Sequence, residues 1–145
     1  MSMLHEKDTD ELFSELKEDA DIRQFLSENE QEFKRPLHVY LEELLKERQL
    51  RKQDVIRDAG LDQVYGYHIF SGTKRNPSRT KILPIAIAMG LDLGRTQQLL
   101  RYAGQPMLYP RNPWDSIIIS AIQKGLSVRD TNALLAQLGE QGLLG

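Results

Sequence analysis

Apolar residues recur along most of the chain at intervals of three and four, the spacing of an amphipathic helix, and no stretch alternates convincingly as a strand does. After Pro36, which suits a helix start, the segment 37–50 places leucines and Tyr40 on one face with Glu and Lys opposite. We predict an all-α protein. Its further helices are expected within 51–60, 62–71, 79–90, 91–104, 114–125 and 126–139.

Two more helices are predicted near the start of the chain, and both are rich in acidic residues. The first would be capped by Asp8 or Thr9 and the second would be short. Their apolar stripes are Leu12, Phe13 and Leu16 in the first, and Ile22, Phe25 and Leu26 in the second. The polar run 27–35 is expected to link them to the rest.

The last two helices repeat the two before them. When 82–104 is shifted by 35 positions onto 117–139, nine of 23 residues are identical, all of them apolar, turn or capping types. Such a pattern preserves the packing of a helical hairpin, and stacked hairpins bury each other's apolar faces. Trp114 is expected to be a buried anchor of the second copy. One apolar face of two stacked copies would remain uncovered, which suits a dimer contact.

The helix predicted over 62–71 has two distinct faces. Gly66, Ile69 and Phe70 fall together and should face Val55 and Ile56 of the preceding helix. A glycine there lets the two helices approach closely, which offsets its cost of about 1 kcal/mol within a helix. Val64, Tyr67, His68 and Ser71 fall on the opposite side, with Gln63 at the exposed start and Tyr65 at the flank. This outer face can read base edges and thymine methyl groups in a major groove.

The formal net charge of −2 hides a strong asymmetry. Residues 1–34 carry four Lys or Arg against eleven Asp or Glu, a balance of −7, whereas residues 46–81 carry nine against four, a balance of +5. Partner choice follows local charge, so the middle of the chain suits a polyanion. The acidic segment 1–34 could fold over the basic surface and compete with phosphates for it.

Several function classes find no support in the sequence. It has no cysteine and three scattered histidines, so a metal site lacks ligands, and we find no phosphate-binding glycine loop. We therefore expect no enzyme and no cofactor. No apolar run is long enough to span a bilayer, and the first residues lack the pattern of a signal peptide, so a cytoplasmic location is expected.

Residues 37–103 resemble the helix-turn-helix domain of the lambda-repressor-like family, also called the xenobiotic-response-element family. The resemblance rests on the spacing of Gly60 at a turn, the Ile-Phe-Ser-Gly ending at 69–72, Pro77–Ser78 before the fourth helix and the Met-Gly-Leu turn at 89–91. It implies a five-helix domain in which 62–71 is the recognition helix. The family usually has glutamine opening the second helix, whereas this chain has Lys52 there and Gln53 one position later.

Two sets of DNA contacts are predicted from the resemblance and the residue chemistry. The base-contacting residues are Gln63, Val64, Tyr67 and His68. The phosphate-contacting residues are Lys52, Gln53, Lys74, Arg75, Asn76 and Arg79, at helix ends or in the loop after the recognition helix. A neutral contact from Ser78 could join them.

The resulting hypothesis is a sequence-specific transcriptional regulator that binds double-stranded DNA as a homodimer. It divides the chain into an acidic helical segment at 1–35, a helix-turn-helix domain at 36–104 and a helical hairpin at 105–145 packed on that domain. The rival hypothesis is a protein-protein interaction adaptor that keeps the fold without binding DNA. Two features favour the rival hypothesis. The acidic segment could contact a protein partner, and the outer face of 62–71 is aromatic.

Overall fold

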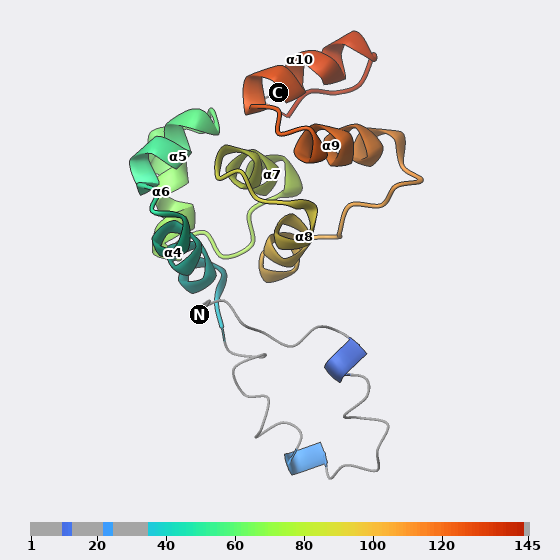
Figure 1. Ribbon diagram of the computed structural model, residues 1–145. Helices are drawn as coiled ribbons and strands as arrows, with labels where there is room; N and C mark the ends of the chain where they lie inside the picture. Colours follow the sequence, from blue (N-terminus) through green and yellow to red (C-terminus); the bar gives the residue numbers. More distant parts are fainter. Residues whose placement is uncertain (1–9, 13–21, 25–34, 144–145) are drawn as a thin grey trace.

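The computed structural model describes residues 10–12, 22–24 and 35–143, and the regular elements in these ranges are all α-helices (Figure 1). The prediction of an all-α protein is confirmed for this part of the chain. Most of the two predicted acidic helices, including Phe13, Leu16, Phe25 and Leu26, lies outside the described residues. The remaining helices are α4 (Leu37–Arg48), α5 (Lys52–Asp58), α6 (Gln63–Ser71), α7 (Arg79–Ala88), α8 (Leu93–Tyr102), α9 (Pro113–Gln123) and α10 (Val128–Gln137).

Helix α7 is the centre of the packing. It contacts α5, α8 and α10, and it lies between the α4–α6 group and the C-terminal helices in Figure 1. Its six consecutive residues from Ile82 to Ile87 are all buried. A helix that is apolar on every side is stable only when neighbours enclose it. None of the described helices is long and apolar enough to cross a membrane.

Helix α4 packs its apolar face against α6 and α8. Its buried residues are Leu37, Tyr40, Leu41, Leu44 and Leu45, and all five belong to the predicted stripe. At its C-terminal end, the Arg48 Nε donates to the Met89 carbonyl at 2.9 Å and its Nη2 donates to the Gly90 carbonyl at 2.9 Å. The end of α4 is thereby fixed to the turn between α7 and α8.

The repeated sequence forms two helical hairpins of the same geometry, α7–α8 and α9–α10. Asp92 and Ser127 cap the second helix of each through their side chains. The Thr96 Oγ1 donates to the Asp92 carbonyl at 2.8 Å, and Thr131 does the same to Ser127 at 2.8 Å. The sequence identity found at a shift of 35 positions therefore corresponds to a repeat in the structure.

The repeat extends beyond the identical residues. The Leu108 N–H donates to the side-chain oxygen of Gln97 at 2.8 Å, and 35 positions later the Leu143 N–H donates to that of Asn132 at 2.9 Å. Both leucines are buried. In both hairpins, α7–α8 and α9–α10, an amide side chain of the second helix therefore binds the segment that follows that helix.

A third hairpin, α5–α6, has the same turn, which the sequence comparison did not identify. The Leu61 N–H donates to the Ile56 carbonyl at 3.3 Å, as Leu91 and Leu126 donate to Ala86 and Ala121 in the later turns. In all three turns a glycine with positive φ precedes the leucine. The described part of the fold therefore contains three related helical hairpins.

The C-terminal hairpin is joined to α7 by a partly buried ion pair. The Arg79 Nη2 lies 2.9 Å from the Asp115 Oδ2, and the Tyr109 N–H donates to the same oxygen at 2.9 Å. Asp115 is only 4% exposed. The Arg79 guanidinium also lies 5.7 Å from the Trp114 ring centroid. Trp114 was expected to be buried but is half-buried, and its Nε1 donates to the Gln141 carbonyl at 2.8 Å.

Candidate nucleic-acid interface

Helices α5 and α6 form a closely packed unit joined by a short turn. Gly66 faces α5, where an added Cβ would lie 2.6 Å from the Ile56 Cγ2. Ile69 and Phe70, on the same side of α6, are fully buried. The predicted inward position of Gly66 is confirmed, and it leaves the other side of α6 facing outward.

The ends of α6 are fixed by local contacts. Asp62 lies just before the helix as its N-cap, and its carboxylate accepts a hydrogen bond from the Tyr65 N–H at 3.0 Å. At the other end Gly72 adopts φ 88°, a left-handed conformation that disfavours other residues. The helix therefore starts one residue later than predicted.

The outer side of α6 carries the predicted base-contacting residues. Val64 is 63% exposed, and Gln63 and His68 are also exposed. Tyr67 differs, since it is half-buried and its side chain packs against the core. Tyr65 at the flank is also half-buried, with the Lys81 Nζ 5.7 Å from its ring centroid.

An open hollow of about 550 Å³ lies between α5 and α6. It brings together Gln53, Gln63 and Tyr67, three residues predicted to contact DNA. Their amide and phenol groups offer both hydrogen-bond donors and acceptors to a partner. The full lining is Gln53, Asp54, Ile56, Arg57, Gly60, Leu61, Gln63 and Tyr67.

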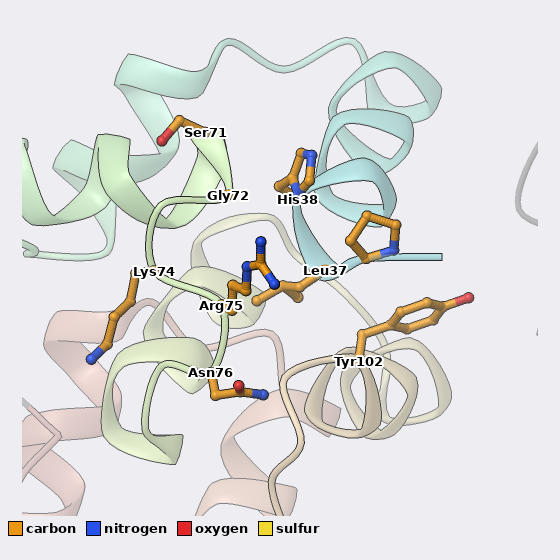
Figure 2. Close-up of a pocket in the computed structure, with 9 residues that line it drawn as sticks. Leu37, His38, Ser71, Gly72, Lys74, Arg75, Asn76 and Tyr102 are labelled. Atoms are coloured by element: carbon orange, nitrogen blue, oxygen red, sulfur yellow. The ribbon is translucent and has the colours of Figure 1, made fainter. Parts of the chain in front are cut away.

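The loop between α6 and α7 carries two exposed basic residues, Lys74 and Arg75. Within the described ranges, neither forms an ion pair. Their side chains diverge: in Figure 2 the Lys74 side chain extends away from α4, whereas Arg75 points toward His38 and Leu37 at the start of α4. Both were predicted to contact phosphates; in the structure their side chains point in different directions, although both border the same hollow near the start of α4.

Three of the expected phosphate contacts have partners within the protein. The Lys52 Nζ pairs with the Glu42 Oε1 at 2.9 Å, and the Asn76 Nδ2 donates to the Ala103 carbonyl at 3.1 Å. Arg79 is held by Asp115, as described above. Lys52 joins α5 to α4, Asn76 joins the loop after α6 to the end of α8, and Arg79 joins α7 to α9.

Two exposed arginines beside the hollow were absent from the predicted site. The side chains of Arg51 and Arg57 are 73% and 70% exposed, and both pair with Asp54, at 3.2 and 3.4 Å. Exposed ion pairs of this kind contribute little and can exchange partners readily. Their place in the basic segment 46–81 was the signal that could have identified them.

The described residues contain no group of three His, Asp or Glu side chains placed to hold a metal ion. Comparisons with family models, with curated proteins and with solved structures found no match to the chain.

Proposed function

We propose that the chain is a sequence-specific DNA-binding regulator that places α6 in the major groove. The observation that carries this proposal is the two-sided character of α6. Gly66 packs tightly against α5, while Gln63, Val64 and His68 stay exposed on the other side. A B-DNA major groove admits one helix, and its base edges present donors, acceptors and thymine methyl groups.

The exposed side chains of α6 match those base features chemically. The Gln63 amide can both donate to and accept from a base, and the His68 imidazole can do the same. Val64 offers an apolar surface of the kind that contacts a thymine methyl group. Tyr67 lines the hollow beside α5 and is half-buried, and on this proposal its exposed part faces the groove.

Basic and polar groups around α6 support phosphate contacts. Lys74 follows the helix in the loop, while Arg51 and Gln53 lie at the start of α5. Contacts at these two places would hold the backbone on either side of the groove and set the register of α6. On this proposal α4 to α8 correspond to the five helices of a lambda-repressor-like domain, and a homodimer places two copies of α6 on a palindromic site.

The proposal is tested by selecting duplexes that bind the full chain from a random library, followed by mobility shifts with the selected sequences. A common sequence motif is expected among the bound duplexes. The same assay on random duplex at low salt separates the two hypotheses. Binding that weakens steeply with salt supports the regulator, and an absence of any shift contradicts it and supports the adaptor.

A further inference from the structure

A second hollow, of about 580 Å³, lies at the far end of α6 from the hollow beside α5. This open hollow is bordered by the start of α4, the end of α6, the loop that follows α6 and the end of α8 (Figure 2). Its volume is typical of a site for a small molecule. The lining residues are Pro36, Leu37, His38, Ser71, Gly72, Lys74, Arg75, Asn76 and Tyr102.

Among the described residues that line it, three can carry a positive charge, His38, Lys74 and Arg75, and none is acidic. Arg75 points from the loop toward His38, and the two side chains face the same space in Figure 2. Among the described residues, no carboxylate pairs with either of them. A guanidinium presents several donors in a fixed plane and suits the oxygens of a phosphate group. The imidazole adds a donor opposite it.

The absence of a side chain at Gly72 leaves room for the His38 ring beside the pocket. An added Cβ on Gly72 would lie 2.7 Å from the His38 Nδ1, so the ring occupies space that a larger residue would fill. The same glycine ends α6 with a positive φ. One residue thus serves both the helix end and the pocket.

The start of α4 adds a favourable field. The helix has 12 residues, and Pro36, its N-cap, provides no side-chain hydrogen bond to the first turn. The positive end of the helix dipole therefore lies at the pocket without a side-chain cap, where it favours an anion.

The other part of the lining is apolar or aromatic. Pro36 and Leu37 lie on one side, and Tyr102 lies on another. The Tyr102 ring is stacked on Tyr40 with 4.2 Å between the centroids and 11° between the planes, so its position is fixed by the core. A ligand with a flat apolar body as well as an anionic group would contact both kinds of wall.

We propose that this pocket binds a small phosphate monoester with an apolar or aromatic body. Arg75 and His38 hold the phosphate group, and Leu37 and Tyr102 contact the body. The proposal is independent of DNA binding. Lys74 also lines the pocket, but its side chain extends away from α4 in Figure 2, so Arg75 is the cation that points toward His38.

The test is a titration of the full chain with phenyl phosphate, followed by calorimetry and by amide chemical shifts. We expect saturable one-to-one binding in 150 mM salt, with shifts centred on Leu37, His38, Gly72 and Arg75. Inorganic phosphate should bind at least tenfold more weakly, and phenol should not bind. R75Q and H38Q should each weaken phenyl phosphate binding by about tenfold or more.

K124Q is the matched control, because it removes the same charge from an exposed position at the end of α9, outside the pocket. It should leave phenyl phosphate binding within twofold, and spectra of all three variants report whether the fold is kept. The proposal is overturned by an absence of saturable binding, by equal losses in K124Q and R75Q, or by equal affinity for inorganic and phenyl phosphate. Full displacement of phenyl phosphate by a short random duplex would assign the pocket to the DNA backbone and would also overturn it.

Discussion

Gly66 of α6 lies so close to Ile56 of α5 that an added Cβ would stand 2.6 Å from the Ile56 Cγ2 and 2.9 Å from its Cγ1. This contact sets the distance between the two helices of the candidate DNA-reading unit. Ile56 is 2% exposed and therefore has little room to move away. Substitutions at Gly66 and Ile56 can therefore test how closely α6 packs against α5.

Replacing Gly66 with alanine should destabilise the protein despite the better helix propensity of alanine. Overpacking of a filled core costs about 1–3 kcal/mol, and urea denaturation would measure this loss. Gly94 in α8 is the matched control, since its added Cβ would meet its nearest atom at an ordinary 3.6 Å. G94A should gain about 0.5 kcal/mol, and an equal response of both variants would contradict the close packing.

The contact also predicts coupling between the two positions. Ile56→Ala alone should cost about 2–5 kcal/mol because it leaves a cavity. In the double variant the new alanine at 66 fills part of that cavity without a clash. The combined loss should therefore be smaller than the sum of the single losses by at least about 0.5 kcal/mol. Simple additivity in a denaturation cycle would show that the two side chains do not meet.

Lys74 and Gln63 should have different effects on DNA binding under the proposed function. Lys74→Ala should weaken binding to all duplexes alike and reduce the slope of log K against log salt by about 1. Gln63→Ala should instead change the preference among duplexes, with about 1–3 kcal/mol lost at one base position. Competition assays across a salt series would measure both. If both variants show the same pattern, the division into phosphate and base contacts is wrong.

Asp115 should be important for holding the C-terminal hairpin on α7. Its removal leaves Arg79 without its partner and the Tyr109 N–H without its acceptor, so Asp115→Ala should lower the free energy of unfolding by about 3 kcal/mol. Amide exchange should quicken first in α9 and α10. Asp58→Ala is the control, because that exposed carboxylate pairs with Arg57 at the surface and its loss should cost no more than about 0.5 kcal/mol.

Deleting residues 1–34 should strengthen DNA binding if the acidic segment competes with phosphates. The shortened chain begins at Arg35, which precedes α4, so the helices from α4 onward keep their sequence. The gain should be on the order of tenfold at low salt and should shrink as salt screens the attraction. A fluorescence-anisotropy titration of both chains would measure it, and unchanged affinity at every salt concentration would remove the competition hypothesis.

The sequence by itself determined the helices, the repeat and the two faces of α6. These features depend on spacings of three and four residues and on turn residues such as Gly90, which act locally. The inward position of Gly66 could be predicted for the same reason, because a helix fixes which residues share a face. The α5–α6 hairpin was not recognised as a third copy because it shares the turn geometry of the other two hairpins but not their helix residues.

Tertiary structure alone decided which polar side chains are engaged within the protein and which stay available. Arg79 pairs with a residue 36 positions away, and Asn76 bonds to a carbonyl 27 positions away. Lys74 and Arg75 in the loop after α6 line a pocket together with residues of α4 and α8, and only Arg75 points toward His38. Periodicity describes one helix at a time, whereas these partners meet only when several helices pack around α7.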